Sequence, residues 1–347
     1  MPRSDLGRGA AYNPANRFEP FHVERLDADD EQRPVPTRTF VDSTRSILAQ
    51  NDSPDVPFEF SINPYRGCEH GCIYCYARQT HEYLGFSAGL DFESKILVKP
   101  DAPKLLEQAF RRKSWKPQPV CLSGNTDCYQ PLERHLELTR RCLEVFLKYR
   151  NPVTMITKSH LITRDLDILR QLARFNLVSA QFSITTLDPD LARMMEPRAA
   201  APGRRMEALR SLAESGIPTG VSVSPVIPGL TEEEIPAILK EAAANGATAA
   251  MYILVRLPLA VEELFVDWLE RQMPARAGKI LNRLREIRGG KLSTSDFDTR
   301  KRGEGKIAES IRALYDLCCR KYGLNQAEIR LATHHFVRDS SAQLGLF

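Results

Sequence analysis

Short apolar runs alternate with segments of helical periodicity along the middle of the chain. Between the apolar runs lie amphipathic stretches in which apolar residues recur every three or four positions. Six strand–helix units in this order predict an α/β fold with a parallel sheet. We expect the six strands at 58–63, 119–123, 153–158, 177–184, 217–225 and 248–256.

The helices between these strands are predicted from their apolar spacing. One helix is expected to carry Leu132, Leu136, Leu143 and Leu147, and another Met206, Leu209 and Leu212. Thr231 with Glu234 has the pattern of a capping box, and Gly216 and Gly246 stand where helices would end. Pro152 should end the helix that precedes it.

The two ends of the chain differ from this alternating centre, which we assign to 58–272. Residues 1–57 are rich in Pro, Arg, Asp and Asn and predict an irregular arm. Residues 273–342 predict a helical extension that closes the open side of the sheet. One of its helices carries Ile280, Leu284 and Ile287 on one face, and another helix is centred on 307–317. The basic loop between them is expected to be solvated, with phosphate contact as the alternative.

Composition and charge narrow the class of protein only a little. The chain has 347 residues, with 48 basic and 44 acidic side chains and a formal net charge of +4. This balance permits binding of nucleic acid through local patches and does not require it. No apolar run reaches the about 18 residues of a membrane helix, and no signal peptide is visible. We expect a cytoplasmic protein without a membrane partner.

Three of the eight cysteines lie within eight residues, as Cys68, Cys72 and Cys75 in the spacing CxxxCxxC. Thiolates bind iron–sulfur clusters, zinc or copper. Because a four-iron cluster normally takes four cysteines, a set of three leaves one iron open for another ligand. Zinc with His70 or His81 as fourth ligand is one alternative, although structural zinc sites more often split their ligands into two separated pairs. Free thiols or disulfides are the other alternative.

The spacing CxxxCxxC, with Tyr74 before the last cysteine, resembles the signature of the radical S-adenosylmethionine (SAM) superfamily. The resemblance implies a partial (β/α)6 TIM-like barrel and a 4Fe–4S cluster whose open iron chelates SAM. One electron then cleaves SAM to a 5′-deoxyadenosyl radical, while the protein orients and shields the reaction. A reductant such as flavodoxin or ferredoxin is implied as a partner.

Active sites of parallel β/α folds lie at the carboxyl ends of the strands, so we expect the contacts to SAM there. The loop after the second strand stands where the superfamily usually has a Gly-Gly-Glu-like segment, but it lacks the glutamate. A lysine suits the methionine carboxylate, hydroxyls suit ribose or methionine, and apolar groups suit adenine. For each residue, a turn or core role is the alternative. The predicted residues are Ser123, Gly124, Asn125, Thr126, Asp127, Lys158, Ser159, Ser183, Thr185, Val223, Ile253 and Val255.

Three segments, RGCEHGCIYCYA, TDCYQPLE and TKS, resemble the group related to spore photoproduct lyase over roughly residues 58–260. The resemblance implies that the radical takes hydrogen from a thymine dimer, and that a cysteine with nearby tyrosines returns it. Tyr74 and Tyr76 match these tyrosines. The position of the donor cysteine falls near Gly124, which leaves Cys121 or Cys128 as a displaced donor, or else a different reaction. Cys128 is the better candidate, because Cys121 lies within an apolar strand and a core role is its alternative.

The last residues, 343–347, read QLGLF and resemble the peptide with which bacterial repair proteins dock into the sliding clamp. Packing of this tail on its own domain is the alternative. Three functions therefore stay open. They are a radical enzyme acting on a DNA lesion or modified base, a radical enzyme acting on a small molecule or protein, and a clamp- or DNA-binding module with a structural metal.

Overall fold

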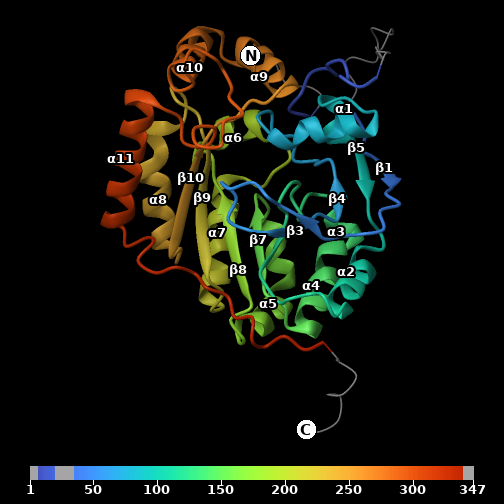
Figure 1. The fold of residues 1–347 in the computed structure, drawn as a ribbon. Coiled ribbons are helices and arrows are strands. Elements are labelled where there is room, and N and C mark those ends of the chain that lie inside the picture. Colours follow the sequence, from blue (N-terminus) through green and yellow to red (C-terminus); the bar gives the residue numbers. More distant parts are fainter. Residues whose placement is uncertain (1–6, 20–34, 339–347) are drawn as a thin grey trace.

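The computed structural model describes residues 7–19 and 35–338, and its main sheet is built from six parallel strands. They lie side by side in chain order, the order expected of a partial (β/α)6 barrel (Figure 1). The prediction of an α/β fold with a parallel sheet is confirmed. The strands are β3 (Phe60–Ile62), β6 (Val120–Leu122), β7 (Val153–Thr157), β8 (Val178–Ser183), β9 (Thr219–Val226) and β10 (Ala249–Leu254).

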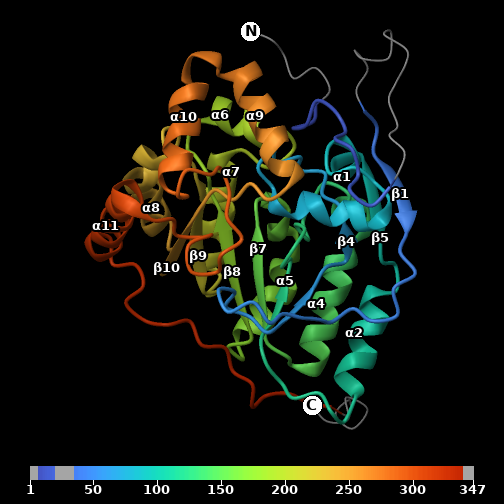
Figure 2. The same cartoon turned by 45° about the horizontal axis from the view of Figure 1, so that its top comes forward.

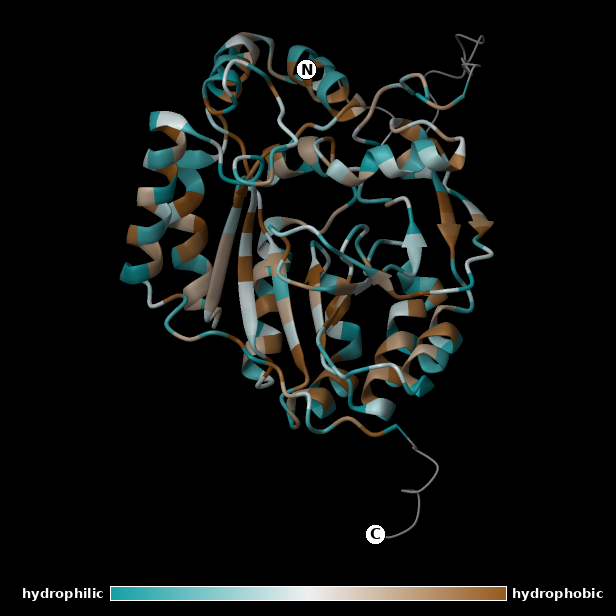
Figure 3. Cartoon of the chain, in the orientation of Figure 1, coloured by the Kyte–Doolittle hydropathy of each residue, from teal (hydrophilic) through white to brown (hydrophobic). Residues whose placement is uncertain are grey.

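Side-chain alternation explains why these runs form strands. In β7, Val153, Met155 and Thr157 are buried, whereas Thr154 and Ile156 are half-buried, which is the period of two expected for a strand. Figure 3 shows hydrophobic residues along the strands and on the helix sides that turn toward them. The longer helices that cover the parallel sheet are α2 (Ala102–Arg111), α4 (Leu138–Tyr149), α5 (Leu166–Ala173), α7 (Pro202–Glu214) and α8 (Ile235–Ala244).

The helix predicted around the leucines of residues 132–147 is two helices, which corrects the prediction. The chain breaks at Glu137, whose φ of 50° is left-handed, between α3 (Glu133–Leu136) and α4. The buried carboxylate of Glu133 accepts the N–H of Thr139 at 3.0 Å, and so supplies the cap at the start of α4. Leu132 and Leu136 pack in a small separate cluster and not in the main core.

The capping box predicted at Thr231 and Glu234 is also wrong. Thr231 Oγ1 accepts the N–H of Ile227 at 2.9 Å, and the carboxylate of Glu234 accepts the N–H of Leu187 at 2.7 Å. Instead of a capping box, a short 3-10 helix, η4 (Glu232–Glu234), precedes α8. Gly216 and Gly246, in contrast, have left-handed backbones at the ends of α7 and α8, as predicted.

The chain before residue 58 contributes two short strands that the sequence pattern did not predict. β1 (Arg38–Val41) pairs with β5 (Lys95–Val98), which also pairs with β4 (Tyr65–Arg66). β2 (Ala49–Gln50) adds an antiparallel strand beside β3. The division of the chain into an arm, a barrel and an extension stays a prediction.

Three helices follow β10, namely α9 (Ala260–Gln272), α10 (Pro274–Glu286) and α11 (Gly305–Lys321). The first two lie at the carboxyl ends of the strands, near the short helix α6 (Pro189–Met195) (Figure 2). Trp268 Nε1 of α9 donates to Met194 O of α6 at 3.2 Å. α11 packs on α8, and Asn325 bonds both main-chain groups of Ala250 on the edge strand β10. None of the described helices is long and apolar enough to span a bilayer.

Candidate functional site

The three clustered cysteines lie in the loop between β4 and the 3-10 helix η2 (Tyr76–Leu84). All three are free thiols; Cys68 and Cys72 are buried and Cys75 is half-buried. Burial raises the pKa of each thiol, and the guanidinium of Arg78 lowers that of Cys75 in part. Such thiols become thiolates when a metal cation binds them. The donor set therefore fits an iron–sulfur cluster.

Two histidines, His70 within this loop and His81 in η2, have polar partners of their own. His70 Nδ1 lies 3.3 Å from Asp127 Oδ2, and His81 Nε2 lies 2.8 Å from the carbonyl oxygen of Lys95. Burial lowers the pKa of His81 to about 4, so its imidazole is neutral. In the described residues, no three His, Cys, Asp or Glu side chains converge as a metal-holding group. In a four-iron cluster, each cysteine ligates a different iron, so the sulfurs stand apart.

Glycines and one buried arginine shape the cysteine loop. Gly67 and Gly71 have φ of 83° and 67°, and a Cβ at Gly71 would lie 2.6 Å from Glu93 Oε2. The fully buried Arg78 pairs with Glu93 and donates to the carbonyl of Cys72 at 3.0 Å. The backbone of the loop is therefore fixed by glycine geometry and by a buried ion pair.

Polar side chains from two strand ends, the cysteine loop and the segment after α6 meet in one group, which we call the interior polar cluster. Lys158 Nζ donates to Ser183 Oγ at 2.7 Å and lies 3.2 Å from Glu196 Oε1. Thr185 Oγ1 donates to the same carboxylate oxygen at 2.7 Å, and the Tyr74 hydroxyl also donates to it. The cluster consists of Tyr74, Lys158, Ser183, Thr185 and Glu196.

Sequence reasoning missed Glu196 and its partner Arg205. Arg205 is fully buried on α7, pairs with Glu196 and donates to the carbonyl of Ser183 at 2.9 Å. Burial alone would raise the pKa of Glu196, but Arg205 and Lys158 hold it well below its ordinary value. The signal available in the sequence is a single acidic residue directly after the two methionines that end α6.

The interior polar cluster and the cysteine loop form one site. The N–H of Ile73 donates to the carbonyl of Met195 at 3.0 Å, which joins the loop to the end of α6. Burial raises the pKa of Cys72, Glu196 raises it further, and Lys158 lowers it. Tyr74, which stands between Cys72 and Cys75 in the chain, belongs to the interior polar cluster, and Lys158 Nζ lies 5.6 Å from the centre of its ring.

Loop 123–127 binds mostly to itself and to its neighbours. Asn63 Oδ1 accepts the N–H groups of Asn125 at 2.9 Å and Thr126 at 3.2 Å. Ser123 Oγ donates to the carbonyl of Thr126 at 2.8 Å. Within the described part of the chain, the side chain of Asn125 makes no hydrogen bond, so it is the group in this loop that is left for a ligand.

Asp127 ties this loop to the end of β7. Its carboxylate accepts from Thr157 Oγ1 at 2.8 Å and from the N–H of Lys158 at 2.7 Å. Burial raises the pKa of Asp127, but His70 and the N–H groups of Lys158 and Tyr129 bring it below its ordinary value. These protein groups already occupy the carboxylate of Asp127. Its predicted contact with SAM stays a prediction.

Tyr76 brings three segments of the site together. It is 42% exposed, and its hydroxyl donates to the carbonyl of Gly124 at 2.9 Å. The guanidinium of Arg256, just after β10, lies 5.7 Å from the centre of the Tyr76 ring. The buried Nε of Arg256 has no hydrogen-bond partner among residues 7–19 and 35–338.

The two cysteines near the second strand end are both buried. Cys121 lies within β6, between two residues of the main hydrophobic core, and is 1% exposed, and burial raises its pKa to about 12. Cys128 is fully buried in the main hydrophobic core, and its N–H donates to Ser123 Oγ at 3.3 Å. The role of Cys128 as a hydrogen donor stays a prediction.

Ser159 and Val255 have structural roles that are visible in their contacts. Ser159 Oγ accepts the N–H of Leu161 at 3.2 Å and caps the 3-10 helix η3 (His160–Asp165). Val255 is 1% exposed, and its N–H donates to the carbonyl of Val226 at 2.9 Å. Their predicted contacts with SAM are not required to explain either position.

Strand register places Val223 on the helix side of the sheet. Val223 pairs with Tyr252, whose ring packs against that of Tyr315 of α11 in a tilted arrangement, at 4.7 Å between centroids. Paired residues on neighbouring strands point to the same face. Val223 therefore faces the helices, and its predicted contact with SAM stays a prediction. Because the strand register shifts between Tyr252 and Leu254, alternation does not assign a face to the half-buried Ile253, whose contact with adenine also stays a prediction.

Comparison with known proteins decides the family. The model described as "Radical SAM superfamily" matches residues 62–242, which is more than half of the chain. The chain belongs to the radical SAM superfamily. The matched region contains the cysteine loop, the interior polar cluster and loop 123–127.

Relatives of this radical SAM protein occur in bacteria and archaea. An uncharacterized protein of Mycobacterium tuberculosis H37Rv is 34% identical over 234 residues, which is 67% of this chain and 68% of that protein. An uncharacterized protein of Methanocaldococcus jannaschii is 31% identical over 176 residues, covering 51% and 63% of the two chains. The structure of spore photoproduct lyase complexed with dinucleoside spore photoproduct matches with a TM-score of 0.56 at 17% identity, covering 82% and 80%. At this identity the likeness shows a shared fold.

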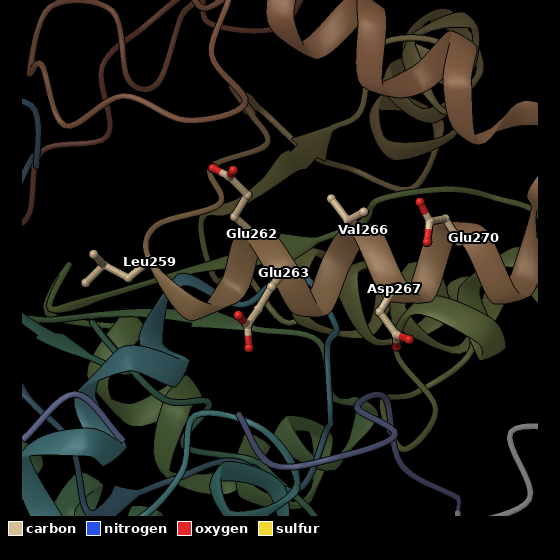
Figure 4. Close-up of a pocket in the computed structure, with 6 residues that line it drawn as sticks. All are labelled: Leu259, Glu262, Glu263, Val266, Asp267 and Glu270. Atoms are coloured by element: carbon tan, nitrogen blue, oxygen red, sulfur yellow. The ribbon is translucent and has the colours of Figure 1, made fainter. Parts of the chain in front are cut away.

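One surface furrow of the radical SAM protein lies away from the cysteines. It measures about 640 Å³ and lies along one helix, α9 (Figure 4). Four carboxylates line it, from Glu262, Glu263, Asp267 and Glu270. The furrow is an acidic surface without a cysteine or a basic residue among its lining groups.

Proposed function

We propose that this radical SAM enzyme holds a 4Fe–4S cluster on Cys68, Cys72 and Cys75 and binds SAM beside it. The bound cluster and SAM would supply a 5′-deoxyadenosyl radical that abstracts hydrogen from a substrate. The observation that carries the proposal is the position of three free, largely buried thiols on the loop that also supplies Tyr74 to the interior polar cluster. The family itself implies SAM and a cluster in general.

The chain's own groups have defined parts in this proposal. Lys158, Ser183 and Thr185 offer a cation and two hydroxyls beside Tyr74 of the cysteine loop, and Asn125 offers an amide at the neighbouring strand end. Glu196 Oε1 lies 3.2 Å from Lys158 Nζ and holds it in place, so Lys158 is preorganised for an anionic group such as the methionine carboxylate of SAM. Ile253 supplies apolar surface for adenine.

For the substrate, we propose a nucleic-acid lesion or modified base, in keeping with the lyase-like fold. Tyr74 and Tyr76 flank the third cysteine, one buried and one half-exposed, and Cys128 is the candidate hydrogen donor. A small-molecule or protein substrate is the second candidate, because Cys128 lies in the core and not where the donor cysteine was expected. The tail 343–347 lies outside the described residues, and its docking into a sliding clamp stays a prediction.

The test is anaerobic. The protein is reconstituted with iron and sulfide, reduced with dithionite and given SAM, and 5′-deoxyadenosine is assayed with and without ultraviolet-irradiated DNA. We expect deoxyadenosine from the wild type and none from Cys68→Ala. Cys142→Ala, which removes a buried thiol on α4 away from the cysteine loop, is the matched control.

The outcomes separate the three functions. A rise with irradiated DNA supports the nucleic-acid substrate, and deoxyadenosine that ignores DNA supports a different substrate. Zinc retained in place of a cluster, with no deoxyadenosine, would mean that the metal is structural.

A further inference from the structure

A basic cleft of about 460 Å³ opens on the side of the cysteine loop away from the interior polar cluster. Loops after three successive strands and the segment between α6 and α7 form its walls, and His70 and Tyr129 are among its buried lining residues. None of the described residues that line it is acidic. Its basic lining groups are Arg134, Arg164, Arg198, Arg204, His70 and His160.

The carboxylates that balance these arginines do not line the cleft. Arg164 pairs with the buried Glu133, and Arg198 lies 3.1 Å from the buried Glu69. Arg204 pairs with Glu207 on the exposed side of α7. Arg134 is exposed and has no side-chain partner in the described part of the chain. The cleft therefore presents cations, and the acidic groups lie behind or outside them.

The cleft is directly next to one of the three cysteines that would hold the iron–sulfur cluster. His70 stands two positions after Cys68 in the chain, and the N–H of Arg198 donates to the carbonyl of His70 at 3.3 Å. His70 thus lines the cleft, bonds to Arg198 of the cleft wall and stands near a thiol that would ligate the iron–sulfur cluster. This is a short path for an electron from the surface to the cluster.

A wall separates the cleft from the interior polar cluster. Asp127 bonds both His70 and the N–H of Lys158, and the N–H of Ala200 donates to the carbonyl of Lys158 at 3.2 Å. A base bound in the cleft would have to pass through this main chain to reach the side where Lys158 and Thr185 lie. An electron needs no such passage, so the geometry favours a redox partner over a substrate.

We propose that this cleft is the docking site of an acidic one-electron donor protein; the proposal rests on the proposed function. A reduced flavodoxin would give one electron to the cluster, and its anionic flavin hydroquinone would become the neutral semiquinone without release of a proton. Acidic side chains of the donor would meet Arg134 and Arg204 at the rim. The acidic furrow on α9 would repel the same partner.

The experiment compares two double charge reversals. Arg134→Glu with Arg204→Glu changes the cleft, and Arg312→Glu with Arg320→Glu makes the same change in net charge on exposed positions of α11. Flavodoxin binding is measured by calorimetry on the protein before reconstitution. After reconstitution, the rate of cluster reduction by flavodoxin hydroquinone and by dithionite is followed in a stopped-flow spectrometer.

We expect the cleft variant to weaken flavodoxin binding and slow reduction by at least about tenfold at low salt, with the difference shrinking as salt is added. Dithionite reduction should be unchanged, and the α11 variant should behave as wild type. Equal flavodoxin binding by both variants would overturn the proposal, as would a cleft variant that loses irradiated DNA and keeps flavodoxin. Failure to form any cluster would refute the proposed function instead, because flavodoxin binding is measured without it.

Discussion

Glu196 is the residue on which the buried charges of the site depend. Its carboxylate accepts from Thr185 and Tyr74 and faces the cations of Lys158 and Arg205. In Glu196→Gln, both cations lose their counter-charge in a buried setting. We expect the free energy of unfolding in urea to fall by about 3–5 kcal/mol.

The matched control for this variant is Glu207→Gln. Glu207 also pairs with an arginine, Arg204, but the two side chains are 41% and 55% exposed. Solvent screens such pairs, so the loss should stay below about 1 kcal/mol. Equal losses for the two variants would show that burial does not set the strength of the Glu196 pair.

The same carboxylate predicts how stability depends on pH. Burial opposes ionisation of Glu196, yet Arg205 and Lys158 hold its pKa far below the ordinary 4.5. A carboxyl group whose pKa is lowered by folding stabilises the protein above its unfolded pKa, and this stabilisation is lost as pH falls. We therefore expect the free energy of unfolding of the wild type to fall below about pH 4.5, with part of that slope missing in Glu196→Gln. Urea titrations from about pH 6 to about pH 3 measure the two slopes, and parallel curves would contradict an ionised Glu196.

At the scale of elements, residues 7–19 act as a strap across the cysteine loop. The fully buried Arg8 donates to the carbonyl of Glu93 at 2.6 Å. The carboxylate of Glu93 accepts the N–H groups of Gly9 at 2.8 Å and Ala10 at 2.9 Å, and it also pairs with Arg78. The strap therefore binds the same carboxylate that fixes the cysteine loop.

Gly9 is the position at which the strap is most sensitive to substitution. A Cβ there would collide with the carbonyl oxygen of Gly71, between two cluster cysteines. In Gly9→Ala we expect the strap to lift, with earlier thermal unfolding and weaker retention of reconstituted iron, measured by calorimetry and by iron content after gel filtration. Gly278→Ala is the control, because nothing lies within 4 Å of a Cβ in that α10 position. It should stabilise the protein by about 0.5–1 kcal/mol.

The elements that the sequence could predict are those fixed by local pattern. The six parallel strands were found because each is a buried run of its own, and the cysteine loop because its spacing is local. β1 and β4 were missed because their pairing with β5 joins short, partly polar segments that are far apart in the chain. Glu196 was missed for a similar reason, since its partner Tyr74 is 122 residues away and no spacing rule connects them.

At the scale of the whole molecule, the segment before β3 is tied to the C-terminal extension. Asp55 accepts from Arg300 Nε at 2.6 Å, and Lys301 Nζ lies 3.6 Å from the same carboxylate. Arg300 first, with Lys301 in support, lowers the pKa of Asp55 below its ordinary value. Since the Asp55 and Arg300 side chains are only 13% exposed, the pair is worth more than a surface salt bridge.

A double-mutant cycle between Asp55→Asn and Arg300→Met measures this tie. The two residues are 245 positions apart, so any coupling reflects tertiary structure and not local propensity. We expect a coupling free energy of about 1.5–3 kcal/mol from urea unfolding. The exposed pair Glu328 and Arg330, at 70% and 83%, should give less than about 1 kcal/mol in the same cycle. A coupling near zero for the first pair would mean that the extension is held by its helix packing alone, and that the Asp55 contact follows from that packing without strengthening it.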